Sequence, residues 1–539
     1  MLIGYVSDER YVALSGVMVE IEGGDAGSMV VQSTPTGAVY ADIEPGEYRM
    51  TLAKPGFGAK RVTMAVQHGK PYQFRLLSDR LLGYAWPRWV RGGEASEFKV
   101  HSVEPYRLSL WRYGRQKEFV RLLGWFDEHG PNAVMQITPD GDYTQTGVQW
   151  NTRGYPHPNP TQTVAAPSRS GLYYFHAEGE SGAFFSFPWV VAPTTPQAPI
   201  AVLASTNTWN TYNNFGGRSN YINSTGLPPT PTVNARQELV RYQTDSGADT
   251  WGFPDSDYLP LSFDRPEPFN HIPVDVEVTD PIRGRQPCHL APAEWRFLGW
   301  LEREGFSYDF YAEQQLHSGV LDLDAYKVVV LSVHPEYWSR TMYERLLAWV
   351  QQRGGKLLYL GGNGINCEIE FLDEATLRCN SYRGHPEDRD ASGRPLESRF
   401  HRRVQSEATL LGVAFSYPGI MTAAPYRVVR DHWVFADTGV AVGDVFGEAS
   451  LHERISGGAS GHETDKRTPH SPADTVLLAK GLNPDEGGAE IVYYETASGG
   501  AVYSVGSITY VASILVDPVV SRMTRNVLER FLAGVPMAV

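Results

Sequence analysis

Residues 200–360 alternate between short apolar strands and amphipathic helices, and this alternation limits the fold more than any other feature of the chain. Apolar runs rich in valine, leucine and isoleucine occur at 200–205, 326–333 and 356–362. Segments between them space their apolar residues three or four apart, as on one face of a helix. Strands and helices in turn are typical of a parallel sheet with helices on both faces. We therefore expect residues 200–539 to form a doubly wound α/β domain.

Two of these helices have recognisable ends. Pro292 suits the first turn of a helix over 291–305, because the missing N–H of proline is not needed there. Ser339 can cap a second helix over 341–355, and Gly354 can end it.

The stretch from about 380 to 515 departs from this pattern and predicts a β-rich insertion. Within its last part we expect two strands over 499–515. A closing helix follows over 520–532, where apolar residues recur along one stripe.

The N-terminal part of the chain has short strand patterns and glycine–proline turns. Residues 1–80 predict a small β-sandwich, and the turns within 43–58 make it similar to transthyretin-like, carboxypeptidase-regulatory modules. Residues 81–192 predict a second β-sandwich, with a hairpin over 171–191. The proline-rich stretch 193–199 predicts a linker to the α/β domain. The expected architecture is multidomain.

Composition excludes several classes of partner. The formal net charge of −14 carries no basic patch, which disfavours nucleic acid and anionic membranes. No run of about 18 apolar residues and no leader-like N-terminus is visible, so we expect a cytoplasmic protein without a membrane span. The three cysteines form no CxxC pair, which argues against a zinc knuckle or disulfide framework.

The strand over 326–333 ends in an unusual cluster, His-Pro-Glu-Tyr-Trp. In an open α/β sheet, ligands bind beyond the carboxyl ends of the strands. His334 and Glu336 are two residues apart, and extended backbone would point both side chains to the same side. Pro335 stiffens the connection. The alternative is that Glu336 caps the next helix and His334 bonds to backbone; this stretch alone leaves both open.

Two further segments follow or precede apolar strands. Residues 205–226 are polar, aromatic and glycine-bearing, and contain Tyr212 and Tyr221. Glu463 and Asp465 precede a strand near 476. Taken alone, the tyrosines would be packed and hydrogen-bonded as usual, and a carboxylate in such a loop would be unremarkable.

Residues from about 200 to 539 resemble the large subunit of N,N-dimethylformamidase and its relatives. The most specific block is HPEYWS with the later GGNG, and five matching stretches occur in the same order. These stretches are NTWNTYNNFGGRSNY, SFDRPEP, HPEYWSRTMYERLLAWVQQRGGKLLYLGGNG, SGHETD and GGAVYSVGSITYVASILVDPVVSRMTRNVLERF.

The resemblance implies one ferric iron ion per chain. Its ligands would be Tyr212, Tyr221 and Glu336, with His334 and Glu463 needed for catalysis. It implies hydrolysis of a small N-substituted amide or formamide to a carboxylic acid and an amine. It also allows a small partner subunit, and we expect a homo-oligomer.

Other residues near these positions complete the predicted site. Only eight residues separate the two tyrosines, fewer than in the formamidase pattern, so Tyr258 is kept as a reserve ligand. Trp209, Phe215, Tyr337 and Asn363 flank the proposed ligands and are expected to line the substrate pocket.

The chemistry of this set is coherent. Phenolate and carboxylate oxygens are hard donors that suit ferric iron, and three protein ligands leave open positions for water and a carbonyl. Such an ion polarises an amide carbonyl or lowers the pKa of bound water. An amine leaves only when protonated, so a general acid is required. We favour Glu463 as the base and His334 as the group that orients substrate or stabilises the oxyanion, although the sequence does not order these roles.

Two rival functions remain. The strand and turn over 356–367 resemble class I glutamine amidotransferase-like folds, which is the fold we expect, but Asn363 occupies the sharp turn and Cys367 lies beyond it. A Cys367-dependent amidotransferase-like enzyme is therefore one alternative. A carbohydrate- or protein-binding module without catalysis is the other. It fits the 12% aromatic content but leaves His334, Glu336 and Glu463 without a role.

Overall fold

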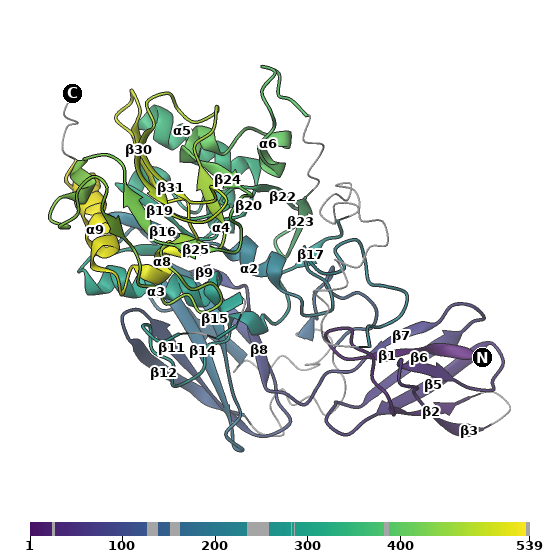
Figure 1. The fold of residues 1–539 in the computed structure, drawn as a ribbon. Coiled ribbons are helices and arrows are strands. Elements are labelled where there is room, and N and C mark those ends of the chain that lie inside the picture. Colours follow the sequence, from purple (N-terminus) through teal and green to yellow (C-terminus); the bar gives the residue numbers. More distant parts are fainter. Residues whose placement is uncertain are drawn as a thin grey trace.

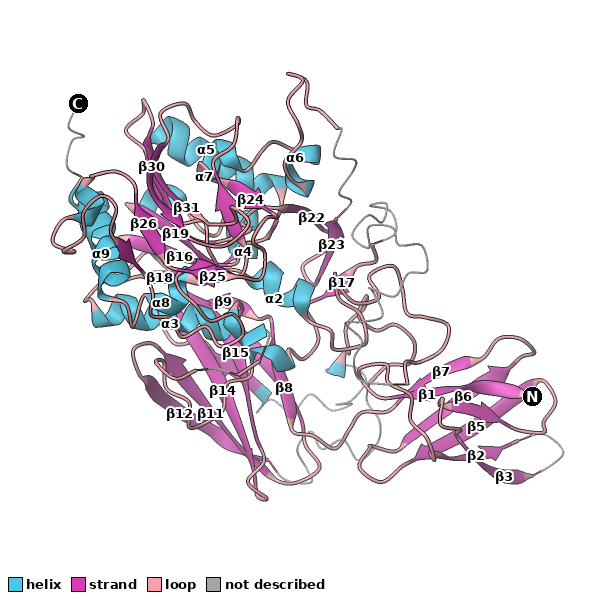
Figure 2. Cartoon of the chain, viewed as in Figure 1, coloured by secondary structure: helices cyan, strands magenta, loops and turns pink. Residues whose placement is uncertain are grey.

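The computed structural model describes most of the chain, and Figure 1 shows its fold. The protein is multidomain and rich in β-sheet, with helices gathered in its C-terminal part (Figure 2). The described residues are 1–23, 27–126, 138–150, 162–233, 258–281, 283–284, 286–381 and 388–534.

The N-terminal unit consists of two sheets that share one apolar core. The three-stranded sheet has the order β4-β1-β7 and the four-stranded sheet the order β3-β2-β5-β6. Side chains from both sheets, such as Val6, Val19 and Met50, meet in this core. The strands are β1 (Leu2–Ser7), β2 (Met18–Glu22), β3 (Ser28–Gln32), β4 (Ala38–Tyr40), β5 (Gly46–Ala53), β6 (Lys60–Val66) and β7 (Tyr72–Arg75).

The second β-rich unit also has two sheets, with orders β13-β10-β8 and β12-β11-β14-β15-β9. The expected hairpin is present as β14 and β15, which pair antiparallel from Gly171 with Val191 to Glu178 with Phe184. The strands are β8 (Leu82–Trp86), β9 (Trp89–Arg91), β10 (Ala95–His101), β11 (Tyr106–Tyr113), β12 (Lys117–Phe126), β13 (Thr163–Ala165), β14 (Gly171–Gly179) and β15 (Phe184–Ala192).

The C-terminal part is built on a nine-stranded sheet of order β18-β16-β19-β21-β32-β31-β30-β26-β27. The first five strands in this order are parallel, and the rest pair antiparallel. The parallel alternation expected from 200 onward is therefore confirmed. The strands are β16 (Ile200–Ala204), β18 (Asp309–Ala312), β19 (Val328–Val333), β21 (Lys356–Gly361), β26 (Tyr426–Val428), β27 (Val445–Phe446), β30 (Val476–Gly481), β31 (Glu490–Glu495) and β32 (Ala501–Ser504).

Helices cover both faces of this sheet. Alternate strand residues face opposite sides, so Val330 packs with α3, α8 and α9, whereas Val329 packs with α4 and α5. The hydroxyl of Ser339 accepts a hydrogen bond from the N–H of Met342 (3.2 Å), as expected of a cap. The helices are α2 (Thr206–Tyr212), α3 (Ala291–Arg303), α4 (Glu313–Ser318), α5 (Arg340–Arg353), α6 (Arg399–Arg403), α7 (Ala408–Leu411), α8 (Tyr510–Ser513) and α9 (Pro518–Ala533).

Smaller strands and turns lie around the carboxyl end of the parallel strands. A four-stranded sheet has the order β17-β23-β22-β20, and two short ladders pair β24 with β29 and β25 with β28. These strands are β17 (Leu261–Ser262), β20 (Tyr337–Trp338), β22 (Cys367–Phe371), β23 (Thr376–Asn380), β24 (Ala414–Ser416), β25 (Ala423–Ala424), β28 (Ser460–Gly461) and β29 (Thr464–Lys466). Short 3-10 turns lie at Pro268–Asn270, Gln286–Cys288, Leu323–Ala325 and Trp433–Phe435. Among the described helices, none is long and apolar enough to cross a membrane.

The prediction of two strands over 499–515 is wrong. One strand forms, β32, and the second apolar run becomes the helix α8. All four residues of α8 are buried. A short apolar run does not distinguish a buried helix from a buried strand, because neither shows a polar face.

The central strand β21 offers a test of this architecture. The side chain of Leu358 is fully buried in the core that β21 shares with α3 and α9. Leu358→Ala is expected to cost about 2–5 kcal/mol and to lower the thermal unfolding midpoint by roughly 4–10 °C. The matched control is Leu372→Ala, since Leu372 is 47% exposed, and it should change stability by less than about 0.5 kcal/mol. An equal effect of both variants would contradict the placement of β21.

Candidate active site

The strand β19 ends in strained backbone. Val333 has φ +60°, a left-handed conformation that a β-branched residue rarely adopts. The hydroxyl of Thr208 holds the next residues, because it donates to the carbonyl of His334 (2.7 Å) and accepts from the N–H of Glu336 (3.2 Å). The extended course of the strand therefore stops at Val333, and the following side chains are fixed beyond its carboxyl end.

His334 and Glu336 lie side by side at this end, as predicted, but not through the extended backbone that the prediction assumed: the N–H of Glu336 donates to the carbonyl of His334 (3.0 Å) in a tight turn at Pro335. The Nε2 atom of His334 is 3.3 Å from Oε2 of Glu336, and both side chains are buried. Glu336 does not cap the following helix, since Ser339 fills that position. Its carboxylate is used instead by side chains from three other segments.

Two tyrosines converge on Glu336. The hydroxyl of Tyr212, at the end of α2, donates to Oε2 of Glu336 (3.0 Å). The hydroxyl of Tyr221 lies 2.9 Å from Oε1 and 3.0 Å from Oε2 of the same carboxylate. The two phenol rings are 4.4 Å apart between centroids. The phenols that hydrogen-bond to Glu336 are thus those of Tyr212 and Tyr221. The reserve residue Tyr258 is buried as well.

Two buried glutamate side chains, Glu294 and Glu313, accept hydrogen bonds from the start of α2. Oε1 of Glu294 accepts from the N–H of Ser205 (2.8 Å), and Oε2 of Glu313 accepts from the N–H of Asn207 (2.8 Å). Acidic groups at a helix N-terminus satisfy its unpaired N–H groups. Burial raises the pKa of Glu294 to about 8. These two hydrogen bonds hold in place the helix α2, which carries Tyr212 at its end.

Arg399 completes the surroundings of Glu336, and sequence reasoning missed it. Its Nη2 atom donates to Oε1 of Glu336 at 2.5 Å, and both groups are buried. Arg399 begins α6, inside the stretch expected to be a β-rich insertion, where no periodic pattern singled it out. Tyr337 also reaches the site, because its hydroxyl donates to that of Tyr221 (2.7 Å) and accepts from Nδ2 of Asn220 (2.8 Å).

Glu463 approaches from the loop before β29. Its Oε2 atom is 3.2 Å from Nε2 of His334 and accepts from Nδ2 of Asn363 (2.7 Å). This approach needs a glycine at position 362, because a Cβ there would lie 2.5 Å from the carbonyl oxygen of Glu463. The site therefore joins the ends of β19 and β21 to a distant loop.

Charges in this cluster shift its proton equilibria. Burial raises the pKa of Glu463, but the hydrogen bond and charge of His334, with Asn363, outweigh it and lower the pKa overall. Burial lowers the pKa of His334, but Glu463 and then Glu336 outweigh it and raise the pKa overall. A protonated imidazole between two carboxylates is consistent with both directions.

A second histidine orients His334, and no sequence signal indicated it. The Nδ1 atoms of His289 and His334 are 3.0 Å apart, so one Nδ1–H donates a hydrogen bond to the other Nδ1. His289 also packs edge-on against Tyr212, with ring centroids 4.7 Å apart. His289 lies just before α3. The pattern that predicts this helix consists of apolar residues and does not include a histidine before its start.

Two predicted pocket residues lie in packed surroundings. The indole N–H of Trp209 donates to Oε1 of Glu294 (3.3 Å), beside α3. Phe215 packs in the core of the second β-rich unit, with its ring centroid 6.0 Å from that of Tyr143. Tyr337 and Asn363, by contrast, hydrogen-bond to the cluster directly.

The donor set at Glu336 suits a hard cation. Two phenols and a carboxylate offer hard oxygen atoms, and the 2.9–3.0 Å contacts between them match the roughly 2.9 Å edge between oxygens about 2.1 Å from an octahedral ion. Burial and the charge of Glu336 raise the pKa of both Tyr212 and Tyr221, so without a cation each phenol keeps its proton and donates a hydrogen bond to Glu336. A bound cation takes the place of such protons.

Another cluster of potential ligands is less suitable. Atoms of Asp390, His401 and His470 lie within 4.8 Å of one another. However, Nδ1 of His401 accepts from the N–H of Glu397 (3.1 Å), which leaves the ring proton on Nε2. A histidine nitrogen must be free of its proton to bind a metal. The oxygen set at Glu336 needs no such rearrangement of backbone contacts.

The fold and the site define an α/β protein with an oxygen-rich polar centre at the carboxyl ends of its parallel strands. The chain belongs to the family described as N,N-dimethylformamidase beta subunit-like, C-terminal, whose model matches residues 104–521. The match begins well before residue 200, so the similarity extends into the second β-rich unit, further than the sequence motifs indicated.

Two curated relatives are N,N-dimethylformamidase beta subunits. The protein of Paracoccus aminophilus is 28% identical over 292 residues, which is 46% of this chain and 37% of the relative. That of an Alcaligenes species is 28% identical over 311 residues, which is 48% of this chain and 40% of the relative. The aligned part is less than half the length of each relative.

Among solved structures, a β-galactosidase from Bacillus circulans sp. alkalophilus aligns with 44% of this chain and 27% of its own. The TM-score is 0.26 at 14% identity, and a similarity this low carries no argument about the fold.

Proposed function

We propose that this chain is a metal-dependent hydrolase of small N-substituted amides or formamides, which releases a carboxylic acid and an amine. The main support is that the phenols of Tyr212 and Tyr221 both hydrogen-bond to Glu336. Nε2 of His334 lies between this carboxylate and that of Glu463. The membership of the dimethylformamidase beta subunit-like family supports the same chemistry. We propose Tyr212, Tyr221 and Glu336 as ligands of one ferric iron ion per chain.

The proposed ion supplies Lewis acidity toward an amide carbonyl and lowers the pKa of a water molecule. The guanidinium of Arg399 is a buried positive charge beside Glu336. It partly offsets the negative charge of the proposed ligands, which would otherwise be costly to bury. Tyr221 and Glu463 are half-buried, with the Glu463 side chain 15% exposed, so we propose that a small substrate approaches the cluster from their side.

Glu463 is proposed as the general base. Its lowered pKa keeps the carboxylate ionised, and its position next to His334 allows it to accept a proton from the attacking water. The same group can then protonate the departing amine. His334, held by His289 on one nitrogen and by Glu463 on the other, is proposed to orient the substrate or to stabilise the oxyanion.

The rival involving Cys367 has less support. Cys367 is fully buried at the start of β22, and its Sγ atom faces the hydroxyl of Ser381 (3.4 Å) and the carbonyl of Asn380 (3.6 Å). A nucleophilic thiol needs exposure and a base that lowers its pKa. The parallel sheet still fits a class I glutamine amidotransferase-like fold, which we propose without its nucleophile.

The assembly and location of the protein are proposed on similar grounds. The relatives are named as beta subunits, so we propose that this chain also assembles with a small partner subunit, within a homo-oligomer. The acidic net charge disfavours binding to an anionic membrane surface, and we propose a cytoplasmic location.

Metal analysis of the purified chain tests the proposal. We expect about one iron ion per chain by plasma mass spectrometry, hydrolysis within a panel of small N-alkyl formamides and amides, and loss of hydrolysis on chelation that added iron restores. Amine release reports the reaction. Hydrolysis that survives complete chelation and is blocked by iodoacetamide would favour Cys367 instead.

A further inference from the structure

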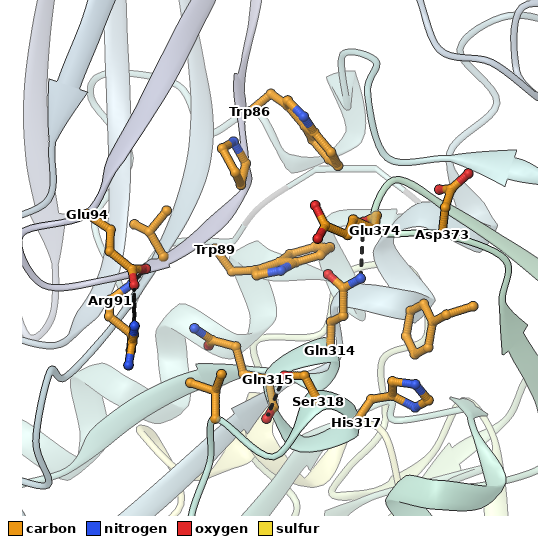
Figure 3. Close-up of a pocket in the computed structure, with 14 residues that line it drawn as sticks. Trp86, Trp89, Arg91, Glu94, Gln314, Gln315, His317, Ser318, Asp373 and Glu374 are labelled. Atoms are coloured by element: carbon orange, nitrogen blue, oxygen red, sulfur yellow. Dashed lines mark hydrogen bonds and ion pairs between the residues drawn. The ribbon is translucent and has the colours of Figure 1, made fainter.

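A cavity of about 570 Å³ lies away from Glu336, between the second β-rich unit and the α/β part (Figure 3). One wall comes from the segment around β8 and β9, a second from α4, and a third from the end of β22. Its size is typical of a small-molecule site. None of the proposed ligands or catalytic groups lines it, so it is separate from the candidate active site.

Aromatic rings form much of the wall. The indoles of Trp86 and Trp89 are 6.5 Å apart between centroids and inclined at 69°, so they present surfaces at a steep angle to each other. Trp89 is supported by the edge of Phe263, at 4.9 Å and 89°. Phe371 also lines the cavity, with its ring centroid 4.6 Å from that of His317 on α4. Both indoles are half-buried, which fixes them while leaving surface toward the cavity.

The charged groups of the cavity are predominantly acidic. Glu94, Asp373 and Glu374 line it, against the single guanidinium of Arg91. Arg91 is already paired with Glu94, at 2.7 Å between Nη2 and Oε1. Within the described parts of the chain, no cation forms an ion pair with Asp373 or Glu374. The cavity therefore has carboxylates that a cationic ligand could neutralise.

The remaining polar groups do not change this balance. His317 lies on α4, and burial, together with the charge of Arg345, lowers the pKa of its imidazole, so the ring is neutral. Its Nδ1 atom is engaged with the hydroxyl of Ser339 (2.8 Å). The amide of Gln314 donates to the carbonyl of Glu374 (3.1 Å), which ties α4 to the acidic edge.

We propose that this cavity binds an organic ammonium cation. Aromatic faces attract an alkylated cation through their π electrons, and nearby carboxylates supply the opposite charge. An anion is disfavoured by Asp373 and Glu374. A neutral sugar would stack on the indoles and its hydroxyls could donate hydrogen bonds to the carboxylates, but it carries no charge to balance them. The sign of the ligand's charge therefore distinguishes these two classes.

Titration of the full chain with tetramethylammonium chloride, followed by calorimetry, tests the proposal. We expect saturable binding that weakens with added salt, and at least tenfold weaker binding of the neutral isostere tert-butanol and of glucose or cellobiose. Binding of the sugars or of tert-butanol as tight as that of the cation would overturn the proposal, and so would no cation binding.

Variants locate the bound cation. Trp89→Ala should weaken binding at least tenfold and Glu374→Gln about threefold or more, whereas Trp125→Ala, at a 65% exposed tryptophan on β12, should leave it unchanged. If Trp89→Ala does not fold, binding by Glu374→Gln still tests whether the cation occupies this cavity. Leu372→Ala, at a 47% exposed residue next to Asp373, should bind tetramethylammonium as the natural chain does. Full binding in folded Glu374→Gln would contradict this site.

Discussion

Glu336→Ala should lose its metal and its amide hydrolysis together. Glu336 is the one group of the proposed ligand set that both Tyr212 and Tyr221 contact, and its backbone is fixed by Thr208 at the end of β19. Without this carboxylate, two phenols remain, and burial favours their neutral form. The metal content of the variant should fall to background, and amine release should fall with it.

Controls separate this effect from unfolding. Removal of Glu336 leaves the guanidinium of Arg399 buried without its partner, which can cost about 3–5 kcal/mol. Glu336→Gln keeps the side-chain volume and should also lose the metal, while circular dichroism checks its fold. Glu344→Ala, at an exposed position on α5, should keep both metal and activity. Full iron occupancy in folded Glu336→Gln would refute the ligand role.

The part of the site that periodicity could predict is the part carried by regular strands and helices. The strand over 326–333 and the capped helix after it fixed the positions of His334 and Glu336, and the structure places the two side chains together. Parallel strands end at one edge, so their terminal residues have a predictable location.

The contributions of loops were not predictable in this way. Nothing in the spacing of Tyr212 and Tyr221 indicates that both meet Glu336; that expectation came from the resemblance. Arg399 begins the short helix α6, and His289 lies between a 3-10 turn and α3, outside the periodic part of that helix. Only tertiary contacts bring these two residues to the cluster. The error over 499–515 has a related cause, because burial on all sides removes the amphipathic pattern that identifies a helix.

Glu463→Gln should keep the metal and lose turnover. Glu463 contacts His334 and Asn363 rather than the two phenols, and glutamine has the same shape and can still accept from Nδ2 of Asn363. It has no basic oxygen to take a proton from water. We expect kcat to fall by about 10²–10⁴-fold with unchanged iron content and little change in KM.

The two variants should differ in metal content: Glu336→Ala should lose the ion, whereas Glu463→Gln should keep the ion and lose only the proton transfer. Glu448→Gln is a suitable control, since Glu448 is exposed in the same β-rich segment and should leave kcat unchanged. If Glu463→Gln turns over amides at the natural rate, the base must be another group. His334, which shares its Nε2 contact between Glu463 and Glu336, would then be the next residue to replace, because it already lies within hydrogen-bonding distance of both carboxylates.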